Sequence, residues 1–289
     1  MDKIPENLSK ELKIIKKQSD KTIDVKYIPV ISIKKVQGLA EKYNLSFLNI
    51  EIAALRENIM PERYERNYDS ISFSEQIKLL SSNVAVIGCG GLGGSIIEML
   101  ARLGVGNLIL VDGDTFKESN LNRQLISTEN KIGKNKAEVA AERITKINSS
   151  VKIKSCPQFV DATNIQQVIQ GADLAIDALD NIPSRFVLAK ACRELKIPFI
   201  HGAINGFNGQ VSTIFPQDKG LEAIYGPPQR YDQENKKERV SAPSFSPTMI
   251  ASFQVAETIK VLLNRGKNLR NKLLLINIEE LEINVVEIK

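Results

Sequence analysis

The sequence predicts an α/β fold: a Rossmann-like, doubly wound and mostly parallel sheet, with added antiparallel strands in the C-terminal part and a helical extension at the N-terminus. Two observations predict it. Between residues 83 and 202, apolar runs of strand length alternate with stretches that suit helices, which is typical of a parallel sheet with helices on both faces. The first run leads into the glycine-rich stretch VIGCGGLGGS at 86–95, as the first strand of a dinucleotide-binding fold does.

Residues 1–60 are predicted to form the helical extension, and residues 61–289 the main domain. Apolar residues recur among polar ones in the extension as they do in amphipathic helices. Ser32 suits the N-cap of one of these helices, because its hydroxyl can accept from a backbone N–H of the first turn. The predicted helices lie at 9–18, 32–43 and 46–59.

The main domain is predicted to begin with five parallel strands, four of them followed by a helix. These strands are expected at 83–88, 107–114, 151–156, 172–180 and 197–202. The remaining predicted elements are a strand at 206–214, a crossing loop at about 216–243, a helix at 246–266, and two antiparallel strands at 272–278 and 282–289. The crossing loop holds the charged run DQENKKER at 232–239, and loops of that length are usually functional or mobile.

Composition indicates a packed globular protein. Of 289 residues, 43% are hydrophobic and 25% are charged, which is close to average globular usage. The net charge of +5 is too small to suggest a nucleic-acid partner. No stretch approaches the ~18 apolar residues of a membrane span, and the N-terminus lacks the apolar core of a signal peptide. Three scattered cysteines fit a reducing compartment, so we expect a cytoplasmic protein with no membrane partner.

The glycine turn raises the question of which nucleotide it serves. Gly88, Gly90 and Gly93 match the spacing G-x-G-x-x-G, which lets the backbone turn tightly and approach a phosphate. Asp112 follows at the end of the next predicted strand, where an acidic residue holds the ribose hydroxyls. NAD-dependent dehydrogenases and ATP-using enzymes share these features, so they do not decide between the two.

Two cations favour a polyphosphate. Arg123 lies in a polar segment after Asp112, and its planar guanidinium binds phosphate oxygens in pairs. Lys136 lies near the start of the next predicted helix, where the helix dipole also attracts anions. Asp180 follows an apolar strand, and a carboxylate there can hold Mg²⁺ together with substrate phosphates. Asp177, inside the same strand, is expected to be buried or structural.

The motifs GGLG, VDGD, SNLNRQ, GKNK, DALDN and GAINGFNGQV occur in the order and spacing of the ThiF/MoeB/HesA family, the bacterial relatives of ubiquitin-activating enzymes. From about residue 60 to the C-terminus the chain resembles this family. The resemblance implies an ATP- and Mg²⁺-dependent adenylyltransferase that activates the C-terminal glycine of a ubiquitin-like sulfur-carrier protein ending in Gly-Gly. It also implies a homodimer, in which Arg66 of the segment RYERN reaches the ATP phosphates in the neighbouring subunit.

The same resemblance assigns the site residues. The nucleotide-binding residues would be Gly88, Gly90, Gly91, Gly93, Asp112, Ser119, Asn120, Asn122, Arg123, Gln124, Lys136, Asp180 and Asn181. The catalytic residues would be Arg66, Arg123, Lys136 and Asp180, the last of which would hold the metal. Asn181 also suits the N-cap of the helix that follows it. No general base is needed, because a carboxylate nucleophile is already ionised at pH 7.

The chain departs from the family in its cysteines. Many members bind a structural zinc through paired C-x-x-C motifs, but no cysteine lies between Ala203 and the C-terminus, so we expect no zinc. The same absence removes the cysteine with which some relatives form a thioester or acyl persulfide, which predicts that this protein stops at the acyl adenylate. Cys89, Cys192 and the single histidine, His201, are expected to be structural. The extension would cover the dimer or help to dock the carrier.

Three other functions stay open at this level. A related dehydratase adenylates a carboxylate on modified tRNA, and the modest charge counts against it. An NAD-dependent oxidoreductase would explain the glycine turn but would leave Arg123, Lys136 and Asp180 without a role. A non-catalytic relative would bind a carrier without activating it, although every charged motif residue is present. The sequence does not indicate whether the sulfur serves thiamine, a molybdenum or tungsten cofactor, or an amino acid.

Overall fold

The structure is a computed structural model that describes residues 5–17, 22–23, 28–231 and 241–288. The charged run expected at 232–239 lies outside the described residues, as do parts of the extension and the last residue of the final predicted strand. No helix within the described ranges has the length and apolar character that crossing a bilayer requires.

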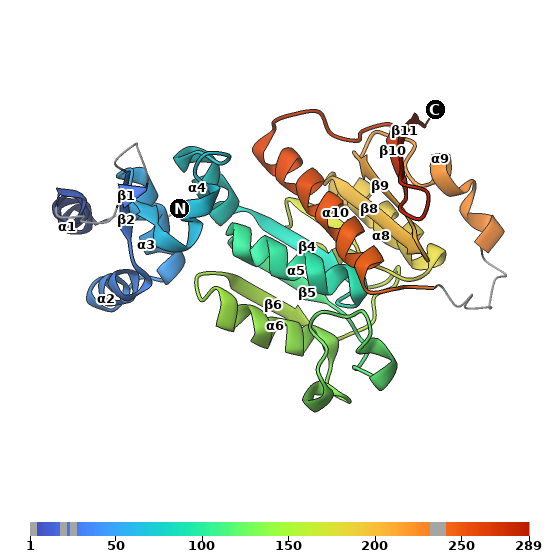
Figure 1. Ribbon diagram of the computed structural model, residues 1–289, viewed down its shortest axis with the longest axis horizontal. Helices are drawn as coiled ribbons and strands as arrows, with labels where there is room; N and C mark the ends of the chain where they lie inside the picture. The colour runs from blue at the N-terminus through green and yellow to red at the C-terminus, as the bar shows by residue number, and fades with distance from the viewer. Residues whose placement is uncertain (1–4, 18–21, 24–27, 232–240, 289) are drawn as a thin grey trace.

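An eight-stranded sheet forms the centre of the molecule, in the order β11-β10-β9-β8-β7-β4-β5-β6 (Figure 1). The parallel strands are β4 (Asn83–Ile87), β5 (Asn107–Val111), β6 (Lys152–Cys156), β7 (Leu174–Asp177) and β8 (Phe199–Asn205). Antiparallel pairing adds β9 (Asn208–Ile214), β10 (Lys272–Asn277) and β11 (Glu282–Glu287). The predicted fold class is therefore confirmed, including the antiparallel C-terminal strands.

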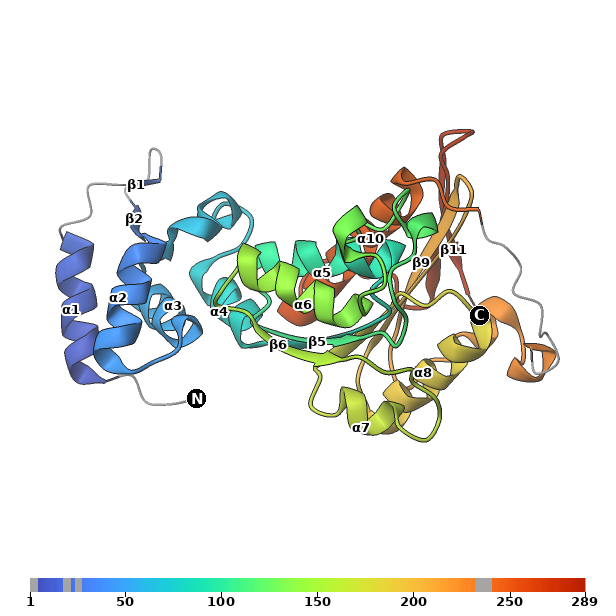
Figure 2. The same ribbon diagram turned by 90° about the horizontal axis from the view of Figure 1, so that it is seen from below.

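Helices cover both faces of the sheet (Figure 2). One face carries α5 (Gly91–Leu103), α6 (Lys136–Ile147) and α10 (Phe245–Leu263), and the other carries α7 (Ile165–Ile169) and α8 (Ile182–Leu195). Strand β4 serves both cores, because Val84 and Val86 pack in the first, and Ala85 and Ile87 in the second. Side chains that alternate across a strand explain why this run is apolar throughout.

Local capping fixes where the helices of the main domain begin and end. Asn135 caps α6 by accepting from two backbone N–H groups of the first turn. Asn181 caps α8 by accepting from the backbone N–H of Ser184 at 2.9 Å, as its position predicts. Helix α5 ends at Gly104, whose φ of 85° is one that glycine adopts without strain.

The N-terminal extension contains the three predicted helices, α1 (Glu6–Lys17), α2 (Ile33–Tyr43) and α3 (Phe47–Arg56). It also contains a small sheet that the sequence does not predict. In that sheet β2 (Ile28–Ile31) pairs antiparallel with β1 (Thr22–Ile23) and parallel with β3 (Met60–Pro61). The extension forms one end of the molecule (Figure 1) and has an apolar core of its own.

A short 3-10 helix, η2 (Glu62–Asn67), and α4 (Phe73–Ser81) join the extension to the main domain. Tyr64 is buried at this junction. Its hydroxyl donates to Glu51 of α3 at 3.2 Å and accepts from the side chain of Asn148, just after α6, at 2.9 Å. A buried tyrosine thus links the extension to the main domain through hydrogen bonds to both.

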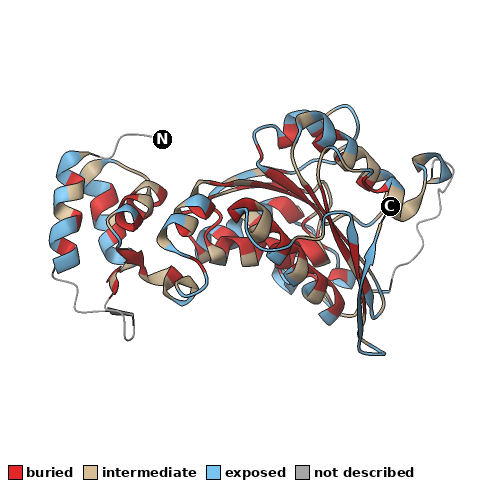
Figure 3. Cartoon of the chain, turned by 90° about the horizontal axis from the view of Figure 1, so that it is seen from above, coloured by how far each residue is buried: buried red, intermediate tan, exposed pale blue. Residues whose placement is uncertain are grey.

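The remaining short helices lie in loops. η3 (Glu118–Asn120) and η4 (Glu129–Lys131) lie between β5 and α6, and α9 (Glu222–Tyr225) and η5 (Pro228–Tyr231) lie in the predicted crossing loop, which is thus partly helical. The sheet ends at β6 on one side and at β11 on the other. Strand β11 is exposed along its whole length (Figure 3).

Candidate active site

The glycine turn joins β4 to α5 at the carboxyl end of the parallel strands, where the strand order reverses direction between the neighbouring strands β4 and β7. Ligands bind at such a point in open α/β sheets. Gly88 has φ of 102°, and a Cβ on it would lie 2.4 Å from the carbonyl oxygen of Ala178. A Cβ on Gly93 would lie 1.8 Å from the carbonyl oxygen of Gly88. The turn therefore needs glycine at both positions.

The start of α5 suits a phosphate group. Within the described residues no side chain caps this helix, so its first backbone N–H groups can bind an anion. A Cβ on Gly90 would lie 3.4 Å from Gln124 Nε2, and one on Gly91 would lie 3.2 Å from Pro247. Gln124 Oε1 is buried and has no hydrogen-bond partner in the described part of the chain. A narrow cradle with an unsatisfied polar atom fits a polar ligand such as a nucleotide.

Asp112 holds the glycine turn against the end of β5. Its carboxylate accepts from the backbone N–H of Cys89 and from that of Asp114, both at 2.8 Å. Burial raises the pKa of Asp112, and these two hydrogen bonds oppose the rise. The carboxylate is therefore fixed before any ligand binds. Its predicted contact with a ribose stays a prediction.

Lys136 is buried at the start of α6, where its Nζ lies 2.8 Å from Asp114 Oδ2. Burial alone would raise the pKa of Asp114, but the hydrogen bond and charge of Lys136 hold that pKa below its usual range. Asp114 thus holds the Lys136 ammonium beside the end of β5, and the sequence analysis did not predict this role for Asp114. Asp114 is part of the motif VDGD, and that was the available signal.

The polar loop after β5 supports its own arginine. Arg123 Nη1 donates to the carbonyl of Ser119 at 2.8 Å and to Asn122 Oδ1 at 2.9 Å. Asn120 is buried and accepts from the backbone N–H of Lys117. A Cβ on Gly91 would lie 3.7 Å from the carbonyl oxygen of Arg123, so this loop borders the glycine turn.

Asp180 lies on the other side of the turn, just after β7. It is exposed, and its Oδ1 accepts from Asn181 Nδ2 at 3.0 Å. In the described part of the chain, no three His, Cys, Asp or Glu residues form a metal cluster. Asp180 alone would therefore hold Mg²⁺ only with help from phosphate oxygens, which is how this ion is commonly bound in enzymes.

Arg66 lies away from these residues. It is exposed in η2, and a Cβ on Gly104, at the far end of α5, would lie 2.8 Å from the Tyr64 ring of the same segment. Helix α5 has 13 residues and is therefore about 20 Å long. The segments that carry Arg123, Lys136 and Asp180 thus border one turn, whereas Arg66 lies at the opposite end of α5.

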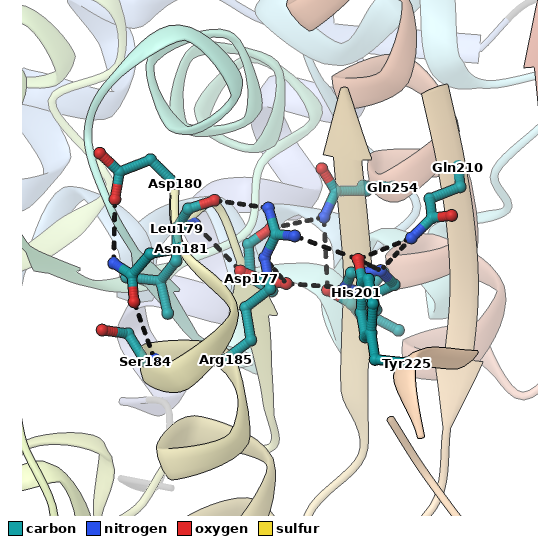
Figure 4. A network of polar contacts seen from close by, with 11 residues as sticks. Asp177, Leu179, Asp180, Asn181, Ser184, Arg185, His201, Gln210, Tyr225 and Gln254 are labelled. Carbon is teal, nitrogen blue, oxygen red and sulfur yellow. Dashed lines mark hydrogen bonds and ion pairs between the residues drawn. The ribbon is translucent and has the colours of Figure 1, made fainter. Parts of the chain in front are cut away.

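A cluster of polar side chains adjoins the site (Figure 4), and four of its members, Asp177, Arg185, His201 and Gln254, are buried. It consists of Asp177, Arg185, His201, Gln210, Tyr225 and Gln254. Asp177 and His201 are fully buried, with 2.7 Å between Asp177 Oδ2 and His201 Nδ1. Burial lowers the pKa of His201, although the hydrogen bond to Asp177 opposes this. The predicted burial of Asp177 is confirmed, and the structural role predicted for His201 is consistent with its full burial.

The three cysteines are free and buried. Burial raises the pKa of Cys89 well above its usual value and raises the pKa of Cys192 to about 12. A thiol with a raised pKa stays protonated and is a poor nucleophile. Cys89 and Cys192 each lie in an apolar core, where a packing residue is expected, and their predicted role stays a prediction.

Comparison with known proteins gives consistent matches. A model of the ThiF family matches residues 64–289. The SAMP-activating enzyme E1 of Haloferax volcanii is 35% identical over 215 residues, which cover 74% of this chain and 80% of that protein. The molybdopterin-synthase adenylyltransferase of Haemophilus influenzae is 33% identical over 236 residues, which cover 78% and 93% of the two chains.

A solved structure of E. coli MccB with MccA has a TM-score of 0.70 at 24% identity. The match covers 88% of this chain and 82% of that one. Residues 64–289 alone make up a smaller share of this chain than 88%. The shared fold therefore reaches into the N-terminal extension, beyond the part that the family model matches.

Proposed function

The chain belongs to the ThiF family of adenylyltransferases, and from that premise we propose that it activates a ubiquitin-like sulfur-carrier protein ending in Gly-Gly. The terminal carboxylate would attack the α-phosphate of ATP, so that an acyl adenylate forms and pyrophosphate leaves. The observation that carries this proposal is the arrangement around the glycine turn. An uncapped helix start lies between one segment that carries two cations and another that carries a carboxylate.

The residues can supply what this reaction needs. A carboxylate and a phosphate are both anions, so the barrier is chiefly electrostatic and falls when fixed cations neutralise the growing charge. Arg123 and Lys136 would bind the phosphates, and Asp112 the ribose. Asp180 would hold Mg²⁺, which supplies further positive charge on the phosphates when bound. The proposed reaction uses no zinc and no cysteine nucleophile, so it ends at the acyl adenylate. Three free cysteines fit a reducing compartment, and we therefore place the reaction in the cytoplasm.

Arg66 would act in a homodimer. Because it lies at the far end of α5 from its own glycine turn, it can contribute to catalysis only in the site of a second copy. Residues 1–60 would then form a separate unit beside the main domain, residues 61–289, where they would help to hold the substrate protein.

A second candidate differs only in the substrate. In this candidate the substrate is a short peptide that the extension binds and that is adenylated at its C-terminal carboxylate. The extension carries part of the fold shared with MccB, which was solved together with MccA. The chemistry at the glycine turn would be the same in both cases. The two candidates differ in what the extension would bind: a folded carrier domain in the first, and a short peptide in the second.

Pyrophosphate exchange tests the proposal. Purified protein with Mg²⁺ and ATP should exchange labelled pyrophosphate into ATP only when a carrier ending in Gly-Gly is added. Removal of the terminal glycine from the same carrier is the matched control, because it leaves the carrier fold intact. Exchange that depends on modified tRNA would favour a dehydratase. A rise in melting temperature with NADH but not with ATP would refute the proposal.

A further inference from the structure

Arg185 is a buried cation that the proposed chemistry does not use. It lies on α8, and its side chain is 9% exposed. Its Nη2 donates to the carbonyl oxygen of Leu179 at 2.7 Å, and its Nη1 donates to the hydroxyl of Tyr225 at 3.1 Å (Figure 4). Its Nε lies 3.2 Å from Asp177 Oδ2, which is close enough for an ion pair but not aligned as a hydrogen bond. The guanidinium therefore joins α8 to two other segments, the end of β7 and the crossing loop.

One of these segments is the turn that carries Asp180. The backbone N–H of Leu179 donates to Asp177 Oδ1 at 3.0 Å, and its carbonyl accepts from Arg185. Both peptide groups of the residue before Asp180 are thus held by buried charged side chains. Two fixed peptide groups set the direction in which the next side chain leaves the backbone. The position of Asp180 depends on this support, because Asp180 is itself exposed.

Tyr225 accepts a hydrogen bond from Arg185 from a different part of the chain. It ends α9 in the crossing loop, and its hydroxyl also accepts from Gln210 Nε2 at 2.6 Å. The same hydroxyl lies 3.1 Å from His201 Nε2. A neutral His201 that donates from Nδ1 to Asp177 leaves Nε2 free to accept from the tyrosine O–H. In this arrangement Arg185 Nη1, Gln210 Nε2, the Tyr225 hydroxyl and His201 Nδ1 each donate to an acceptor.

We propose that Arg185 and Tyr225 are positioning residues for the metal and phosphate end of the site. Tyr225 fixes the guanidinium of Arg185, Arg185 fixes the peptide of Leu179, and that peptide aims Asp180. Without the tyrosine hydroxyl, Nη1 of Arg185 would be a buried donor without an acceptor, and the guanidinium would shift to find one. The inference rests on the proposed function only in that the site must bind ATP with Mg²⁺.

The test is the effect of Mg²⁺ on ATP affinity, measured by titration calorimetry on the full chain. For the wild type, the dissociation constant is measured with Mg²⁺ and again with EDTA, and the ratio of the two is the metal-dependent gain. We expect Tyr225→Phe to reduce this gain by about five- to tenfold, the lower range of coupling between linked sites. Affinity in EDTA should not change, because no metal is then present to be positioned.

Tyr231→Phe is the matched control. Its hydroxyl also belongs to the crossing loop, but it donates to the backbone carbonyl of Tyr225 at 3.0 Å and not to Arg185. This variant should keep the full gain. If Tyr225→Phe keeps it as well, or if both variants weaken binding equally with and without metal, Tyr225 only stabilises the fold and the inference is wrong.

A double-mutant cycle separates positioning from other effects. Asp180→Asn should itself abolish the metal-dependent gain, and adding Tyr225→Phe should then cost nothing further. An additional loss in the double variant would show that Tyr225 acts by another route. If the wild type binds no ATP under either condition, the proposed function fails, whereas a wild-type gain that Tyr225→Phe retains refutes this inference alone.

The single histidine offers a second readout. In ¹⁵N-labelled protein the imidazole of His201 gives one set of side-chain signals, and it contacts both Asp177 and Tyr225. Mg²⁺ with ATP should shift these signals in the wild type, and ATP with EDTA should not. In Arg185→Lys the metal-dependent shift should be lost, because lysine cannot hold Leu179 and Tyr225 at once. Unchanged signals in the wild type would contradict the coupling.

Discussion

Asp177 and Asp180 are three residues apart but lie in opposite environments. Asp177 is fully buried and is held by His201, by Arg185 and by the backbone of Leu179. Asp180 is exposed and accepts one hydrogen bond from its neighbour Asn181. The comparison shows that the end of a single strand can supply two carboxylates, one that stabilises the fold and one that is free to bind a ligand. The two carboxylates differ in how many of their hydrogen-bond and ion-pair partners a bound ligand could replace.

The largest effect should come from the buried residue. Asp177→Ala removes one partner of a buried ion pair and leaves Arg185 without its counter-charge, which typically costs about 3–5 kcal/mol. The free energy of unfolding in urea at pH 7 measures this loss. Asp180→Ala, as the exposed counterpart, should change it by less than about 0.5 kcal/mol. Equal losses in the two variants would remove the distinction between the two environments.

Asp180 and Arg123 should affect rate and not stability. Asp180→Ala and Arg123→Ala should each slow carrier-dependent pyrophosphate exchange by about 100-fold or more, because each loses a transition-state contact of about 3 kcal/mol. Melting temperatures recorded on the same samples should stay near that of the wild type. A variant that loses rate only in proportion to its loss of folded protein would count against a catalytic role.

A third prediction concerns the glycine turn, which packs against Ala178 between the two aspartates. In Gly93→Ala the new Cβ would meet the Gly88 carbonyl at 1.8 Å, so the backbone must move, at a cost of about 1–3 kcal/mol. ATP affinity, measured by calorimetry, should fall with it. Gly38→Ala is the control, since no atom lies within 4 Å of its Cβ in α2. It should gain about 0.5–1 kcal/mol in stability and leave ATP binding unchanged.

The smallest effect concerns pH. Because burial lowers the pKa of His201, the unfolded chain binds more protons than the folded chain as the pH falls through about 6.5, the ordinary pKa of histidine. The free energy of unfolding should therefore fall as pH falls from 7.5 to 5.5, by at most about 1.4 kcal/mol per pH unit from this residue. His201→Gln should lose this contribution, which is measured as the difference between the two pH profiles. Parallel profiles would mean that His201 does not titrate differently in the folded state.

Most of the sheet could be predicted from the sequence, because its strands are long apolar runs and its turn needs glycine for steric reasons. The helices of the extension were predictable from periodicity. Its small sheet was not, because β1 and β3 have two residues each, too few to show any period. The helical turns at 222–225 and 228–231 were missed for the same reason.

The motif residues of the candidate site were easier to predict than the side chains that support them. Lys136 and Arg123 follow a glycine turn in motifs whose residue types indicate phosphate binding. The contacts of Arg185 were not predictable, because they join α8 to Tyr225, which lies 40 residues further along the chain. No local pattern marks a pair so far apart. Asp177 and His201 could be predicted as buried, but not as partners of one another.

The two edges of the central sheet differ in how they would meet another strand. β6 carries Lys152 and Lys154 on its exposed face, and lysines at an edge discourage pairing with a second chain. β11 presents Ile283 and Val285 to solvent, 63% and 55% exposed. We expect concentrated or heated samples to aggregate first through the β11 edge, so Ile283→Lys should raise the concentration at which the protein precipitates.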